Sequence, residues 1–127
     1  MQDIILQKKL VFSNDDKKQC LPTAQQIIKL AKEARQNGVL NLDTKAHQCT
    51  FLTKGLELVV NGRPPEMVER TFRVMILTEN QPNAEYLRRL IIAEGILAIQ
   101  MGVNLKEIAN TLGEMLGEEY AQEILNC

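Results

Sequence analysis

The residues that come nearest to chemistry are a histidine and a cysteine two positions apart, His47 and Cys49. With Cys20 or Cys127 brought close, they would supply nitrogen and sulfur ligands for zinc, or a thiol could act as a nucleophile activated by the imidazole. Residues two apart point to different sides of a helix, although in a strand they share a face. The paired Cys-x-x-Cys spacing typical of zinc sites is absent. We therefore predict neither a metal site nor a catalytic site.

Other common catalytic patterns are missing as well. The acidic side chains lie in polar contexts that give no sign of a buried acid–base pair, and they include Glu66, Glu69, Glu118 and Glu119. The glycines stand where predicted helices end or pack closely, and none belongs to a phosphate-binding loop. We expect a protein that is not an enzyme and that uses no cofactor.

The composition points to one globular domain. The chain has 127 residues, of which 45% are hydrophobic and 24% charged, so it can bury a core of its own. A net charge of −1 gives no general attraction to nucleic acid or to an anionic membrane. No apolar run reaches the roughly 20 residues that span a bilayer, and the first residues do not resemble a signal peptide. Three scattered cysteines suit a reducing compartment. These features predict a soluble cytoplasmic protein without membrane insertion.

The elements that position these residues are helices, and two pairs of them follow the same pattern. Gly55 and Gly62 recur forty residues later as Gly95 and Gly102, each pair followed by a residue suited to opening a helix. The predicted structural unit is a helix that ends at a glycine, followed by a short turn and a second helix that begins at proline or asparagine. This gives two helix–turn–helix pseudo-repeats.

The helices can be placed along the chain from their apolar spacing and their ends. A Thr23–Gln26 capping-box spacing opens the first, which Gly38 ends. Further helices are predicted over residues 51–61, from 64–65 to before 82, over 84–101, and from Asn104, with a separate last helix over 118–126. Residues 1–21 are expected to be an N-terminal arm, a β-hairpin or a short helix, with a polar loop over residues 13–18. Residues 22–127 then form a single domain.

Five or six helices with short connections predict an all-α fold. A short array of helical repeats is the alternative to a compact bundle, because the pattern occurs twice. Two copies are fewer than the three that a free-standing array usually needs, so we predict the bundle.

Three segments resemble the cytoplasmic part of a flagellar motor stator subunit, the MotA family. The segments are ARQNGVLNLD at residues 34–43, FLTKGLELVVNG at residues 51–62 and LIIAEGILAIQ at residues 90–100. They occur in the family's order, and the similar parts cover roughly residues 24–76 and 84–116. The family has membrane helices before the loop-like part and between it and the tail-like part, and this chain has none. The resemblance therefore implies a helical interaction surface without the ion pathway.

In that family, charged residues of the loop contact the C-terminal region of the rotor switch protein. By position in the motif, Arg35 and Asp43 would inherit this role, with Asp43 in place of the more usual glutamate. Lys32 and Glu33 complete the candidate partner-binding set. The simpler interpretation is that Arg35 is an ordinary solvated charge and that Asp43 caps the segment after it.

Two other functions stay open at this point, as does the formation of a homo-oligomer. The module could act as a regulator or scaffold outside the motor, since fold does not fix function. The segment 97–112 has the order of helix, glycine turn and helix found in a DNA-binding helix-turn-helix. Its second helix would present Lys106, Glu107, Asn110 and Glu114, which do not form a basic face. A homo-oligomer could form if the apolar residues of the arm are covered by a second copy; these are Ile4, Ile5, Leu10, Val11 and Phe12.

Overall fold

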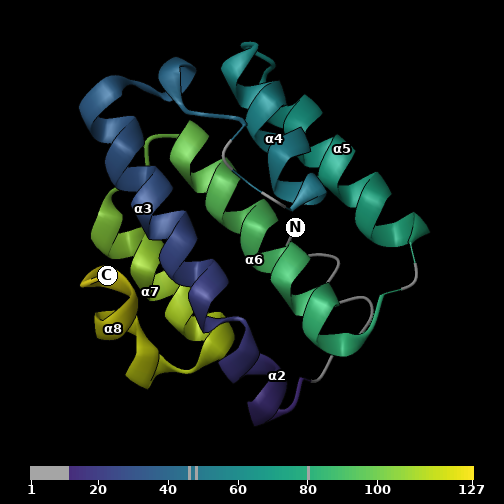
Figure 1. The fold of residues 1–127 in the computed structure, drawn as a ribbon, viewed down its shortest axis with the longest axis vertical. Coiled ribbons are helices and arrows are strands. Elements are labelled where there is room, and N and C mark those ends of the chain that lie inside the picture. Colours follow the sequence, from purple (N-terminus) through teal and green to yellow (C-terminus); the bar gives the residue numbers. More distant parts are fainter. Residues whose placement is uncertain (1–11, 46, 48, 80) are drawn as a thin grey trace.

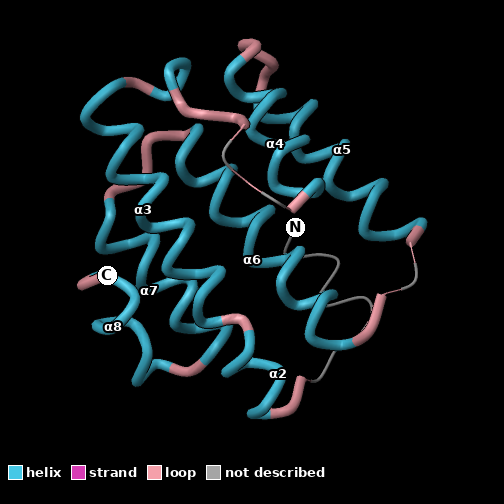
Figure 2. The backbone as a smooth tube through the Cα atoms, in the orientation of Figure 1, coloured by secondary structure: helices cyan, strands magenta, loops and turns pink. Residues whose placement is uncertain are grey.

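A computed structural model describes residues 12–45, 47, 49–79 and 81–127. The described residues are helical and contain no strand (Figure 2). The α-helices are α2 (Asn14–Gln19), α3 (Leu21–Asn37), α4 (Thr50–Val60), α5 (Pro65–Thr78), α6 (Asn83–Gln100), α7 (Leu105–Leu116) and α8 (Ala121–Leu125). Two 3-10 turns, η1 (Val39–Asn41) and η2 (Glu118–Tyr120), join them. The prediction of an all-α bundle is confirmed.

Helix α6 forms the centre of the bundle. It runs between α3 on one side and the α4–α5 pair on the other (Figure 1). Helices α7 and α8 pack against α3, on the side of the bundle away from α5. Nine of its residues are buried, on all sides of the helix, as expected for an element enclosed by neighbours. Its partners α5 and α7 are amphipathic instead, and each buries one face against it. The core therefore forms around one apolar helix.

The predicted pseudo-repeat appears as two copies of one turn. After α4, the N–H of Arg63 donates to the carbonyl of Leu58 at 3.0 Å, and Gly62 has φ of 79°. After α6, the N–H of Val103 donates to the carbonyl of Ala98 at 3.0 Å, and Gly102 has φ of 76°. This is the Schellman motif, in which a glycine with positive φ lets the last carbonyls find donors. The predicted helix ends are confirmed.

The other pair of glycines lies inside helices and serves packing. A Cβ on Gly55 would lie 2.2 Å from Cζ of Phe72 in α5, and a Cβ on Gly95 would lie 2.4 Å from Cγ2 of Ile27 in α3. Equivalent positions of the repeat thus contact different neighbours, because α4 packs on α5 whereas α6 packs most closely on α3. The repeat extends to the turns but not to the packing around these two glycines.

Two predictions near the N-terminus are wrong. Residues 13–18 form most of a helix and not a polar loop, because the Ser13 side chain accepts from the N–H of Asp16 and the Asp16 carboxylate accepts from the N–H of Ser13. This capping box replaces the one predicted at Thr23. Helix α3 instead begins at Leu21, so Thr23 is already inside it and is buried.

The arm predicted over residues 1–21 lies partly outside the described residues, which start at 12. Its apolar residues Ile4, Ile5, Leu10 and Val11 are therefore not placed. Phe12 is half-buried, with its ring centroid 6.5 Å from that of Tyr86 in α6. Helix α2 packs against α6 and α7. The segment that leads into α3 is thus joined to the bundle.

At the other end of the chain, the separate last helix is confirmed. Gly117, with φ of 137°, ends α7, and α8 follows after η2. Ile124 in α8 is fully buried, and Gly113 in α7 lets α8 approach, since a Cβ there would lie 2.9 Å from the Cβ of Ala121. None of the helices in the described ranges has the length and hydropathy to cross a membrane.

Candidate functional site

The candidate partner-binding residues lie at the C-terminal end of α3 and in the turn that follows. Arg35 is exposed and forms no ion pair within the described part of the chain. It borders a hollow of about 160 Å³ between α3 and the α6–α7 turn, whose apolar lining includes Val39, Val103 and Leu105. An unpaired guanidinium beside an apolar hollow can accept a partner's carboxylate and an adjoining apolar side chain together.

One exposed apolar side chain belongs to the turn that borders this hollow. Leu40 in η1 is 62% exposed. It follows Val39, which lines the hollow. We call the group Arg35, Val39, Leu40 and Val103 the turn-end surface. It combines exposed apolar area with one unpaired positive charge.

Lys32 and Glu33 are less exposed to solvent than Arg35. The Lys32 ammonium donates to the carbonyls of Leu125 at 3.2 Å and Cys127 at 2.8 Å, so it ties α3 to the residues around the end of α8. Glu33 is half-buried. The structure therefore gives Lys32 an internal role that its position in the sequence did not indicate, and Arg35 is more available to a partner than Lys32.

The Asp43 side chain is exposed, but it accepts a hydrogen bond from the backbone of its own turn. Its Oδ1 accepts from the N–H of Lys45 at 2.8 Å, and its carbonyl lies 3.1 Å from Nε2 of His47. An aspartate that accepts from the backbone two residues on is the usual way such a side chain fixes a turn. The structure brings Asp43 and Arg35 to the same α3–η1 region, yet it favours the capping interpretation for Asp43.

His47 has two hydrogen-bond partners, and neither is a thiol. Its Nδ1 lies 3.1 Å from the amide nitrogen of Gln26, and its Nε2 faces the Asp43 carbonyl. A single neutral tautomer satisfies both contacts, with Nδ1 accepting and Nε2–H donating. The imidazole therefore fixes the α3–α4 connection. No group of three ligands suited to a metal occurs in the described ranges.

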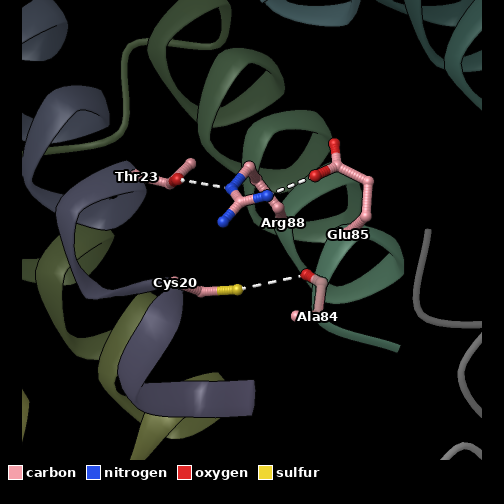
Figure 3. Close-up of polar contacts among 5 residues, drawn as sticks. All are labelled: Cys20, Thr23, Ala84, Glu85 and Arg88. Carbon is pink, nitrogen blue, oxygen red and sulfur yellow. Dashed lines mark hydrogen bonds and ion pairs between the residues drawn. The ribbon is translucent and has the colours of Figure 1, made fainter. Parts of the chain in front are cut away.

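Two of the three cysteines are hydrogen-bonded to backbone carbonyls. Cys20 donates to the carbonyl of Ala84 at 3.3 Å, and Cys127 donates to the carbonyl of Gln25 at 3.2 Å. Beside Cys20, the Arg88 side chain donates to the Thr23 hydroxyl and pairs with Glu85 (Figure 3). The contacts of Cys20 and Arg88 join the start of α3 to the start of α6. Cys20 and Cys127 thus have a structural use, and the hydrogen bonds of the His47 ring go to Gln26 and Asp43 instead.

Burial raises the pKa of the Cys20 thiol, Arg88 opposes this, and Glu85 and Asp16 add to it. The thiolate is the reactive form, and Cys20 is fully buried. We expect native protein to leave Cys20 unmodified by iodoacetamide at neutral pH, with all three thiols modified after denaturation. Peptide mass spectrometry measures this directly. Fast labelling of Cys20 in the native protein would contradict its burial under α6.

A half-buried carboxylate that the sequence analysis missed lies in the middle of α6. Burial raises the pKa of Glu94, the nearby Glu69 adds to the shift, and Oε1 of Glu94 has no hydrogen-bond partner among the residues that the structure describes. The signal in the sequence is a glutamate within the apolar run of residues 90–99. Because the pKa of Glu94 is raised in the folded state, ionisation of this carboxyl lowers the free energy of unfolding. The loss of stability is absent at low pH and develops as the pH rises from the ordinary glutamate pKa through the raised pKa.

The helix-turn-helix interpretation gains no support from the exposed face of α7. Lys106, Glu107, Asn110 and Glu114 all point to solvent, as predicted, and they carry two negative charges and one positive charge. A helix that reads the major groove lies beside phosphates, so carboxylates there oppose binding. The α6–α7 unit is better described as part of the bundle core, with α6 enclosed.

Comparison of the chain with protein-family models, curated proteins and solved structures finds no match. Assignment of a function therefore rests on the surface geometry and on the sequence resemblance.

Proposed function

We propose that this chain is a non-enzymatic protein-interaction domain that binds a partner through the turn-end surface. The observation that supports this most directly is the unpaired, exposed Arg35 beside an apolar hollow, with Leu40 exposed in the turn that borders the hollow. Exposed apolar residues gathered around a charge are typical of binding surfaces, where the apolar part supplies affinity and the charge orients the partner.

The first partner to test is the C-terminal domain of a rotor switch protein, in keeping with the resemblance to the MotA cytoplasmic region. On this proposal the chain acts in the cytoplasm, reproduces the rotor-facing surface of a stator, and conducts no ions. Arg35 would meet a carboxylate of the partner, and the apolar hollow would receive a neighbouring side chain. A regulatory or scaffold protein outside the motor would use the same surface with another partner.

We expect Arg35→Glu to weaken binding to that domain about tenfold, which corresponds to about 1.4 kcal/mol. The substitution replaces an attraction with a repulsion at the edge of the contact, and an exposed pair alone contributes about 0–1 kcal/mol. Isothermal titration calorimetry measures the dissociation constant. Arg70→Glu is the matched control, because Arg70 is an exposed arginine of α5 that does not line the hollow beside Arg35.

A second variant separates the charge from the apolar contact. Leu40→Ser should weaken binding without altering its dependence on salt, whereas Arg35→Glu should reduce that dependence. Saturable binding that neither variant changes would place the contact elsewhere on the chain. Absence of saturable binding to the rotor domain would reject the motor role.

A further inference from the structure

Helix α5 exposes a second apolar surface, on the side that faces away from α6. Met67, Val74 and Leu77 are 43%, 50% and 48% exposed. Met67, Thr71, Val74 and Thr78 follow one another in steps of four, three and four residues, the spacing that aligns side chains along one face of a helix. We call these four residues together with Leu77 the α5 stripe. It runs about 17 Å along the helix, at about 1.5 Å per residue.

The two threonines of the stripe do not interrupt its apolar character. The Thr71 hydroxyl donates to the Met67 carbonyl at 3.0 Å, and the Thr78 hydroxyl donates to the Val74 carbonyl at 2.7 Å. Each hydroxyl thus has a partner in its own helix, which leaves the methyl group as the remaining surface of the side chain. A partner can cover the stripe without leaving these polar groups unsatisfied.

A hollow of about 410 Å³ lies along the stripe where α4 meets α5. Met67, Thr71, Val74 and Met75 line it, together with two positive residues, Lys54 of α4 and Arg70 of α5. None of the described residues that line it is acidic. Neither Lys54 nor Arg70 forms an ion pair with any residue that the structure describes. The hollow is therefore apolar in its floor and positively charged at its border.

We propose that the α5 stripe and its hollow bind an amphipathic helix with an apolar face flanked by carboxylates. An amphipathic helix with one large apolar residue per turn matches the length and spacing of the stripe. Carboxylates beside that face would pair with Lys54 and Arg70. A second copy of this chain fits less well, because two-fold pairing of the same face would bring both lysines and both arginines together. This surface is separate from the turn-end surface, and the inference does not depend on the partner proposed there.

The experiment uses the full chain and two fluorescein-labelled synthetic helices. Both carry leucine at every third or fourth position; one has glutamate at the flanking positions and the other has lysine. Fluorescence anisotropy should show the glutamate helix binding at least about tenfold more tightly than the lysine helix. Val74→Asp should reduce binding of the glutamate helix at least about tenfold, since Val74 lies in the middle of the stripe. Arg70→Glu should remove the preference for the glutamate helix.

Arg35→Glu is the control and should leave both peptides unaffected, and circular dichroism should show that the α5 variants keep their helix content. Equal binding of the two helices, or binding of the glutamate helix that Val74→Asp does not change, would overturn the proposal. Self-association in sedimentation velocity that Val74→Asp abolishes would also overturn it, because the occupant would then be a second copy of the chain.

Discussion

Replacing Gly55 with alanine is expected to lower the free energy of unfolding by about 2 kcal/mol, because overpacking costs up to about 3 kcal/mol and the better helix former returns about 1 kcal/mol. The new methyl group would start 2.2 Å from Cζ of Phe72. That ring has no free space to move into, since it is fully buried and packs against Phe51 with ring centroids 4.8 Å apart. Urea unfolding followed by circular dichroism measures the loss.

Phe72→Leu should partly rescue Gly55→Ala, because leucine lacks the outer ring atoms that the methyl group would meet. The double variant is then more stable than the sum of the two single changes predicts, and a double-mutant cycle gives the coupling. Asn110→Ala is a control for helix propensity at an exposed helical position. If Gly55→Ala gained stability as that control should, the close contact between α4 and α5 would be incorrect.

The helix ends could be predicted from the sequence because their causes are local. Gly62, Gly102 and Asn104 act on backbone groups within a few residues, and Asn104 accepts from the N–H of Glu107 as its spacing indicated. Helix α2 was missed since it buries none of its own residues and so has no apolar periodicity. Its Ser13–Asp16 capping box has the composition of a turn, and sequence alone did not separate the two.

The partners of the candidate site residues could not be predicted, because they are remote in sequence. Lys32 donates to carbonyls more than ninety residues away, and the Gln26 amide reaches His47 across the η1 turn. Periodicity places such residues on a helix without showing what packs opposite them. Arg35 could be singled out only through the resemblance, and its exposure beside a hollow emerged from the fold.

The same limit explains why the two glycines of the repeat differ. Sequence alone shows Gly55 and Gly95 at matching positions, and helix packing assigns Phe72 to one and Ile27 to the other. Two copies of a turn can therefore lie in one bundle without forming a repeat array. Helix α6, the first helix of the second copy, is enclosed in the bundle, with α3 covering one side of it and the α4–α5 pair the other.

Phe72→Ala is expected to lower the free energy of unfolding by about 3–5 kcal/mol, the cost of removing a large buried aromatic side chain and leaving a cavity. Phe72 is fully buried. The Phe51 ring lies against its ring, and Gly55 allows α4 to approach it closely. Val74→Ala and Leu77→Ala, on the exposed side of the same helix, should each cost less than about 1 kcal/mol. Urea unfolding of the three variants measures the contrast.

That contrast separates the residues of α5 that stabilise the fold from those that are available to bind a partner. If the exposed side of α5 contributes little to folding, selection for stability alone does not account for three large apolar residues at Met67, Val74 and Leu77. Loss of about 3 kcal/mol in Val74→Ala or Leu77→Ala would instead make the stripe part of the core. Small losses there, beside a large one in Phe72→Ala, would leave the stripe free to bind a partner helix.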